Sequence, residues 1–356
     1  MHPLWPGVAR RIVEALGVQA GELIQVREGT DRFEIFQAIS LAVEVAGATP
    51  SIEIVTAPYL HQLWNEAPLT YLAQWDQHRR GWMEAYHRVL RLQGDEPKIA
   101  EVRQTGFQAW LEATHRLTQR EEERRLPFLV VAIPTAPRAE AAGLTLAELE
   151  EVMLPALAAP VAELRAANGR ALAAIAGGSF AIRTGGGHLL TLQQGDRRWH
   201  EDDGLLDQED WAKGAFVGNL PSGDIYTTVL EEATEGELWL PVMGEAQDVL
   251  LHFRGGRIIA SEAARGGESL DALFARHTGE PRRISHLGIG LNPYLHTPIG
   301  WTLVDEHIYG QLYFALGENR YMGGQNESSL NIDFIIPNAT FLVDGRVIVA
   351  EGRLVV

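Results

Sequence analysis

The stretch GELIQVREGTDRFEIFQAISLAVEVAGATPSIEIV, residues 21–55, decides how the first part of the chain folds. Between two short apolar runs at 23–26 and 51–55, apolar residues recur over 31–44 at the spacing of one helix face. Asp31 stands at the N-cap position, where its carboxylate can accept a hydrogen bond from a free amide of the first turn. The stretch therefore predicts a strand, a helix and a second strand.

The same alternation continues on both sides of this stretch. Helical patterns are predicted at 8–16, at 76–120 with a break at Pro97, and at 145–167, and an apolar strand at 129–133. Strands and helices in alternation favour a largely parallel sheet with helices on its faces. We therefore expect residues 1–173 to form an α/β domain.

The character of the sequence changes after residue 173. Short β-like runs punctuated by glycine follow, and the last of them, 340–351, turns at Gly345 as in a hairpin. The three glycines at 185–187 predict a turn between two strands rather than a phosphate-binding loop, because no helix begins after them. We expect residues 174–356 to form a β-rich α+β domain that carries the functional cleft.

The composition excludes several classes of protein. Aspartate and glutamate number 47 against 30 lysines and arginines, and the formal net charge of −17 argues against a nucleic-acid partner. The absence of cysteine excludes disulfides, iron–sulfur clusters and thiol nucleophiles. No apolar run reaches the ~18 residues of a membrane span, and the first residues lack the core of a signal peptide. We expect a cytoplasmic protein without a membrane partner.

Four segments place polar side chains beside turn-forming glycine or proline, which is how loops on a rigid scaffold build a site. They are GNLPSGDIYT (218–227), ISHLGIGLNP (284–293), VDEHIYGQLYFALG (304–317) and GGQNESSLNIDF (323–334). In this order they resemble the metal-dependent aminopeptidases of the aminopeptidase T, aminopeptidase S and PepS type. They also resemble a relative on the same fold, the iron-dependent 2,5-dihydroxypyridine 5,6-dioxygenase. The resemblance implies an aminopeptidase T-like two-domain fold, a metal site in the C-terminal domain and a homodimer.

The sequence departs from this family at the positions where the resemblance implies metal ligands. Asp224 and His286 stand for two glutamates, Tyr313 for a histidine, and Asn331 for the histidine of a His-x-Asp pair, while Asp333 is unchanged. A phenol titrates near ~10, and an amide oxygen is a weak ligand for zinc. These substitutions at the positions implied by the resemblance therefore predict that the chain does not bind the family's pair of metal ions.

We accordingly predict a metallopeptidase-like enzyme with a degenerate, metal-free site that acts on a peptide or a small aromatic amino-acid-like substrate. The predicted acid–base residues are His286, Asp333, Tyr313, Asp224 and Tyr321, the last being the nearest match to the family's catalytic tyrosine. Histidine is the side chain best matched to proton transfer near neutral pH. Such chemistry fits peptide tailoring or cyclisation in natural-product biosynthesis, and it needs no cofactor.

Three alternatives remain open. A mononuclear iron dioxygenase-like enzyme would hold a single divalent metal, iron or zinc, with His286, Asn331 and Asp333, or with His296 or His307 completing the set. A non-catalytic peptide-binding protein would use the same cleft to hold a peptide. An active leucyl aminopeptidase would keep the chemistry of the family.

Carboxylates that lie together without a cation need a donor. We therefore expect the Tyr313 hydroxyl within hydrogen-bond reach of Asp333 or Asp224, and Arg320 is the nearest basic residue in the sequence.

Two further acidic clusters are expected to be largely exposed to solvent rather than part of a site. Of Asp305-Glu306-His307, one side chain is expected to point inward and two into solvent, because three successive residues cannot all face one point. The run His200-Glu-Asp-Asp203 is expected to be an exposed acidic loop.

Overall fold

The computed structural model describes all 356 residues, which form two compact units. Unit 1 comprises Met1–Ala158 and Gly204–Pro221, and unit 2 comprises Ala159–Asp203 and Ser222–Val356. The units therefore differ from the expected continuous halves, 1–173 and 174–356. Helix α9 (Val161–Ala174) belongs to unit 2 because it packs on a sheet of that unit, and the segment 204–221 returns to unit 1 to add a strand.

Unit 1 is built on a five-stranded sheet in the order β2-β1-β3-β4-β8, and every neighbouring pair is parallel. The strands are β1 (Leu23–Glu28), β2 (Thr49–Ile54), β3 (Arg88–Gln93), β4 (Phe128–Ala132) and β8 (Val217–Leu220). The predicted α/β class with a parallel sheet is confirmed.

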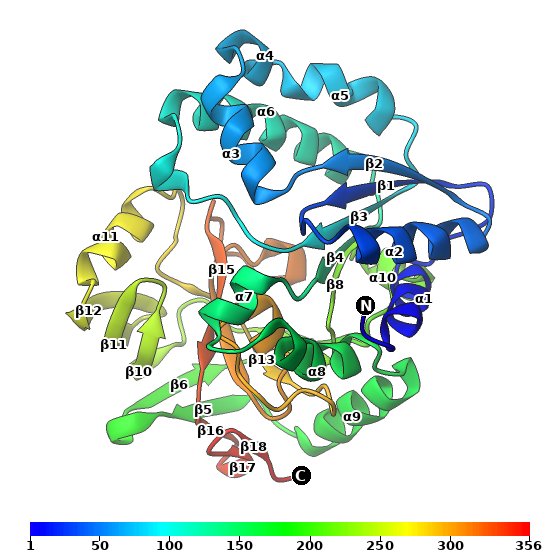
Figure 1. Cartoon of the computed structure of the whole chain (residues 1–356). Helices are drawn as coiled ribbons and strands as arrows, with labels where there is room; N and C mark the ends of the chain where they lie inside the picture. Colours follow the sequence, from blue (N-terminus) through cyan, green and yellow to red (C-terminus); the bar gives the residue numbers. More distant parts are fainter. The chain divides into compact units, whose positions relative to one another are not determined.

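The helices of unit 1 form two groups, which lie on opposite sides of this sheet in Figure 1. One group is α3 (Ala57–Glu66), α4 (Leu69–Ala73), α5 (Trp75–Met83) and α6 (Gln104–Glu123), which pack on one another. The other includes α1 (Trp5–Ala15), α2 (Phe33–Val45), α7 (Ala136–Ala141) and α8 (Leu146–Leu157), and the short helix α10 (Gln208–Lys213) precedes β8.

Two local predictions for unit 1 are wrong. Strand β3 lies inside the stretch 76–120 that was predicted to be helical, so helix ends at Met83 and resumes only at Gln104. Asp31 does not cap α2, because its φ of 61° is left-handed and no side chain caps the helix. The buried carboxylate of Glu28 instead accepts hydrogen bonds from the amides of Thr30 and Asp31.

Unit 2 contains two antiparallel sheets. The eight-stranded sheet has the order β12-β11-β10-β6-β5-β16-β17-β18, and the five-stranded sheet has the order β15-β14-β13-β9-β7. The strands of the larger sheet are β5 (Ser179–Arg183), β6 (Leu189–Gln193), β10 (Glu235–Met243), β11 (Ala246–Arg254), β12 (Arg257–Arg265), β16 (Thr340–Val343), β17 (Arg346–Ala350) and β18 (Arg353–Leu354). Those of the smaller sheet are β7 (Trp199–Asp202), β9 (Asp224–Thr228), β13 (Ile284–Gly290), β14 (Leu312–Gly317) and β15 (Asn331–Ile336).

The predicted turns of unit 2 are confirmed. Residues 185–187 form a 3₁₀ turn between β5 and β6, and Gly345 lies in the hairpin of β16 and β17. The unit also contains the helices α11 (Gly267–Ala275) and α12 (Thr302–Asp305).

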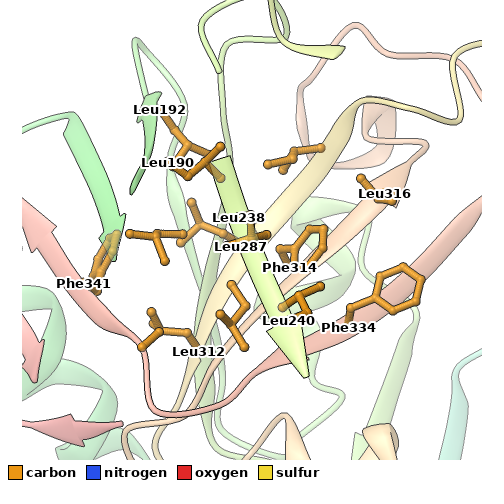
Figure 2. Packing of buried hydrophobic residues seen from close by; sticks show 14 of the residues in the cluster. Leu190, Leu192, Leu238, Leu240, Leu287, Leu312, Phe314, Leu316, Phe334 and Phe341 are labelled. Carbon is orange, nitrogen blue, oxygen red and sulfur yellow. The ribbon is translucent and has the colours of Figure 1, made fainter. Parts of the chain in front are cut away.

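One apolar core joins the two sheets of unit 2. Leu238 and Leu240 from β10 of the larger sheet meet Leu287 from β13 and Phe314 from β14 of the smaller sheet, as Figure 2 shows. These side chains are at most 1% exposed. Only one face of the five-stranded sheet is therefore used for the core, which leaves its other face for polar residues.

None of the helices in the chain is long and apolar enough to cross a membrane.

Candidate functional site

The outer face of the five-stranded sheet in unit 2 carries the polar residues that the sequence singled out. Side chains alternate between faces along a strand, and residues directly opposite each other on neighbouring strands share a face. Asp224 on β9 lies opposite Gly290 on β13, and Gly288 on β13 lies opposite Tyr313 on β14. The residues between them, such as Ile289, belong to the apolar core. The strand period therefore brings four of the predicted site residues, Asp224, His286, Tyr313 and Asp333, onto one face.

Glycine at position 288 makes room for Tyr313. A Cβ atom on Gly288 would overlap the Tyr313 ring, so the ring crosses the sheet directly above this glycine. The Tyr313 hydroxyl then donates a hydrogen bond to Oδ2 of Asp224, two strands away. The expectation that Tyr313 would bond one of the carboxylates is confirmed for Asp224.

Asp224 is a buried acid in a strongly acidic neighbourhood. Only 3% of Asp224 is exposed, and burial raises the pKa of its carboxyl to about 6 against the opposing influence of His307 and the Tyr313 hydrogen bond. Glu306 and Asp333 raise the pKa further through like-charge repulsion. The same burial, together with Asp224, raises the pKa of the Tyr313 phenol well above its usual value, so this phenol remains a donor.

Two further residues join Asp224: Asp202, which was not predicted to take part, and His307, which was considered only as a possible ligand of a single metal ion. Asp202 on the edge strand β7 lies directly opposite Asp224, and His307 approaches with Nδ1 3.8 Å from Oδ1 of Asp224. One ligand atom from each of the three side chains lies within 4.8 Å of the other two. The spacing of His200 and Asp202, two residues apart as on one face of a strand, was the signal for β7.

The expectations for residues 200–203 and 305–307 are therefore wrong. The run 200–203 is not an exposed loop, because residues 199–202 form β7 and pair with β9. In the segment 305–307, both Asp305 and His307 are buried. Asp305 accepts hydrogen bonds from the amides of Ile299 and Gly300, whereas His307 lies against Asp224. The two buried side chains therefore have different partners.

His286 and Asp333 form a second group on the same face. Nε2 of His286 lies 2.9 Å from Oδ1 of Asp333, but Oδ1 makes no aligned hydrogen bond. Nδ1 of the same ring lies 3.1 Å from the hydroxyl of Ser285, and that hydroxyl donates to the carbonyl oxygen of Glu318 at 2.5 Å. His286 is 7% exposed, whereas the Asp333 side chain is 30% exposed.

Tyr321 and Asn331 stand at the exposed end of this second group. Nδ2 of Asn331 donates to the Tyr321 hydroxyl at 3.3 Å. Although 59% of Tyr321 is exposed, burial of its hydroxyl end and the nearby Asp333 carboxylate raise the pKa of the phenol to about 12.

The loop that carries Tyr321 is fixed by Asn319, which is fully buried. Its amide donates to the Thr228 hydroxyl at 2.8 Å and accepts from the amide of Asn326. Asn319 therefore has a structural role, and the loop that it fixes carries Tyr321 to the side-chain amide of Asn331.

Two other expectations fail. Arg320 does not neutralise the buried carboxylates, because its guanidinium pairs with Glu318 at 2.9 Å and with Glu327 at 3.2 Å. His296 is exposed and lies against the carbonyl oxygen of Pro293 at 3.0 Å, so it does not complete a ligand set.

The positions aligned with the family's ligands do not fit a pair of metals. Tyr313 already donates its proton to Asp224, and the side chain of Asn331 is neutral, whereas two cations held close together need several anionic or imidazole ligands. His286 and Asp333 still offer one nitrogen and one oxygen that converge without a hydrogen bond between them. These two ligand atoms alone fit at most one cation.

Comparisons with known proteins agree with the fold and with the sequence resemblance. A 2,5-dihydroxypyridine 5,6-dioxygenase of Pseudomonas putida is 26% identical over 160 residues, which are 38% of this chain and 43% of that protein, so less than half of that relative's length is matched. AmpT from Thermus thermophilus superposes with a TM-score of 0.75 over 99% of both chains at 18% identity. The structure of the Pseudomonas putida dioxygenase superposes with a TM-score of 0.61 over 99% of this chain and 96% of that one, at 17% identity.

These likenesses confirm the predicted aminopeptidase T-like fold and the resemblance to the dioxygenase. At such identities the superpositions concern the fold alone. The sequence profile of the thermophilic metalloprotease (M29) family matches residues 8–354, nearly the whole chain, and the chain therefore belongs to that family.

Proposed function

We propose that this chain is an enzyme that moves protons on a peptide or an aromatic amino-acid-like substrate with His286, Asp333 and Tyr321, without a two-metal centre. The observation that carries the proposal is the His286–Asp333 pair, whose Nε2 and Oδ1 atoms lie 2.9 Å apart. The pair stands beside the exposed residues Asn331 and Tyr321, where a substrate can reach it.

The hydrogen bonds around His286 define its tautomer. The Ser285 hydroxyl donates a hydrogen bond to the carbonyl oxygen of Glu318. The Ser285 oxygen therefore accepts a hydrogen bond from Nδ1–H of His286. In the neutral ring Nε2 then carries the lone pair and is the base. Asp333, beside Nε2, stabilises the imidazolium that forms when Nε2 takes a proton from a substrate N–H, C–H or water.

Tyr321 supplies the acid. Its phenol stays protonated near neutral pH because its pKa is raised, and its hydroxyl lies beside Asn331 at the open end of the pair. It can therefore donate a hydrogen bond to a substrate carbonyl oxygen as negative charge develops there. Tyr313 and Asp224 are buried and joined by a hydrogen bond, so they lie out of reach of the substrate in this mechanism.

A row of rings across the sheet supports a substrate with a flat or aromatic part. His200 and Tyr226 are stacked with centroids 5.2 Å apart, and Tyr226 and His286 lie 5.9 Å apart. The His286 and Tyr313 rings meet edge to face at 5.9 Å. Such rings contribute about 0.5–1.5 kcal/mol per aromatic pair beyond the area they bury.

A mononuclear-metal enzyme is the second candidate, and one observation favours it. Oδ1 of Asp333 is buried without a hydrogen bond beside the lone pair of His286 Nε2, which is the arrangement of two ligands of one ion. A divalent metal held there would supply Lewis-acid chemistry with open positions. The relative from Pseudomonas putida is named as a dioxygenase.

The test is a product screen that assumes no reaction in advance. The purified protein is incubated with short peptides and with aromatic amino acids, and products are separated and weighed by mass spectrometry. Hydrolysis adds one water, cyclisation releases one water, and isomerisation changes only the retention time. We expect His286→Gln and Asp333→Asn to lower turnover by roughly 10²–10⁴-fold, the usual contribution of a positioned base.

His252→Gln is the matched control, because His252 also contacts two carboxylates, Glu237 and Glu262, but lies on the larger sheet. It should leave turnover unchanged. Activity that survives a chelator supports the metal-free mechanism, and activity that is lost and then restored by iron(II) or zinc supports the second candidate. Full turnover in both His286→Gln and Asp333→Asn contradicts both, and binding without turnover leaves the protein a peptide-binding module.

A further inference from the structure

Three side chains of the kind that bind a metal ion lie together near strands β7 and β9 of the polar face. They come from three separate segments. Asp202 is supplied by β7, Asp224 by β9 and His307 by the segment that follows α12. Asp202 and His307 stand outside the positions where the family resemblance places ligands. This group shares no residue with the His286–Asp333 pair.

The convergence is built into the backbone. The register of β7 and β9 sets Asp202 directly opposite Asp224. His307 comes close because position 290 has no side chain: a Cβ there would lie 2.5 Å from the carbonyl oxygen of Glu306 and 2.6 Å from the carbonyl carbon of His307. The glycine thus lets the segment 306–308 lie directly on β13.

The separation of His307 and Asp224 suits a shared ion better than a direct bond. Nδ1 of His307 and Oδ1 of Asp224 are 3.8 Å apart, which is too long for a hydrogen bond. Two metal–ligand bonds of about 2.1 Å span up to about 4.2 Å, so both atoms can bind one cation from these positions. Nε2 of His307 lies 3.4 Å from Glu306, and an N–H directed there leaves the lone pair of Nδ1 facing Asp224.

Two of the donors also have the outer contacts that orient metal ligands. The Tyr313 hydroxyl bonds Oδ2 of Asp224 and leaves Oδ1 to face His307, and the Glu306 carboxylate lies beside the far nitrogen of His307. Carboxylate–histidine pairs and hydrogen-bonded carboxylates are the usual second layer of such sites. Tyr313 is then an orienting residue for Asp224.

We propose that Asp202, Asp224 and His307 bind a single divalent cation. Two carboxylates and one imidazole suit manganese, iron(II), cobalt or zinc, because this mixed set is neither all oxygen nor rich in soft ligands. The proposal is independent of the acid–base function of His286 and Asp333, and either can fail without the other.

The experiment uses the full chain, freed of metal by chelation, and manganese(II) chloride alone as the probe. Binding is measured by titration calorimetry and by the decrease of the free manganese signal in electron paramagnetic resonance. We expect one ion per chain, and we expect Asp202→Asn and His307→Gln each to weaken binding by tenfold or more. Thermal melting in chelator shows whether each variant is folded, and Asp202→Glu, which keeps the charge and the donor, should retain part of the affinity.

Asp203→Asn is the matched control. It removes the same charge from the neighbouring residue, whose carboxylate pairs with Arg165 at 2.5 Å, and it should change the affinity less than Asp202→Asn. Equal loss in Asp203→Asn and Asp202→Asn would show a general charge effect and overturn the assignment. Binding that is lost in His286→Gln and Asp333→Asn but kept in Asp202→Asn would place the ion at the other pair, and no binding at millimolar manganese would also overturn the site.

Discussion

Gly290→Ala should lower the free energy of unfolding of unit 2 by about 3 kcal/mol or more. A Cβ atom there would lie 2.5 Å from the carbonyl oxygen of Glu306 and 2.6 Å from the carbonyl carbon of His307, both closer than real Cβ contacts. The obstacle is backbone, which cannot turn away as a side chain can, so the segment 306–308 or strand β13 has to move. Urea denaturation followed by fluorescence and circular dichroism measures the change.

Gly169→Ala is the control for Gly290→Ala. Gly169 lies inside helix α9 of the same unit, and a Cβ there meets nothing within 4 Å. Alanine in a helix interior is favoured over glycine by about 1 kcal/mol, so this variant should be neutral or stabilised. A Gly290→Ala protein as stable as the parent would mean that the segment 306–308 is not held against β13. The manganese affinity of the folded variant would then also be unchanged.

Tyr313→Phe should lower the free energy of unfolding by about 2 kcal/mol at pH 8, measured in chelator. The change removes the hydrogen bond to Asp224 while keeping the ring above Gly288, and a buried charged acceptor that loses its donor costs about 1–3 kcal/mol. The measurement is chemical denaturation at several pH values.

The cost of Tyr313→Phe should depend on pH. Burial raises the pKa of Asp224 in the folded protein from 3.8 to about 6, so Asp224 favours folding fully below pH 3.8 and loses that contribution as the pH rises through about 6. Only the ionised carboxylate needs the Tyr313 donor, so the cost should be smaller at pH 5 than at pH 8. A cost that is flat over this range would contradict the assignment.

Tyr294→Phe is the control for Tyr313→Phe. The Tyr294 hydroxyl donates to Glu163 at 2.7 Å, and Tyr294 is 39% exposed, so water replaces the lost partner. Its cost should stay below about 1 kcal/mol at every pH. Equal costs for the two tyrosines would mean that Asp224 is solvated in solution.

The sequence predicted the regular parts of the fold because their signals are local. The parallel sheet of unit 1 follows from the alternation of apolar strands and amphipathic helices, and the hairpin of β16 and β17 follows from Gly345. Strand β3 was missed because its apolar residues, Val89, Leu90 and Leu92, also fit the helical spacing of the stretch around it. Periodicity alone does not separate a short buried strand from a helix.

Only one contact of the candidate site could be predicted from the sequence. The contact between Tyr313 and Asp224 was predicted because a buried carboxylate needs a donor, and that need does not depend on the exact geometry. The approach of Asp202 and His307 to Asp224 depends on strand order and on the free space at Gly290. These are long-range features, and no short segment of the sequence carries them.

The ring of Tyr313 above Gly288 has an evolutionary consequence. Glycine is required at position 288 only while a long ring crosses it, so the two positions constrain each other's substitutions. Relatives that carry a shorter side chain in place of Tyr313 should accept alanine or serine in place of Gly288, and relatives with a tyrosine should not. Sequence changes at these two positions should therefore be correlated across the family.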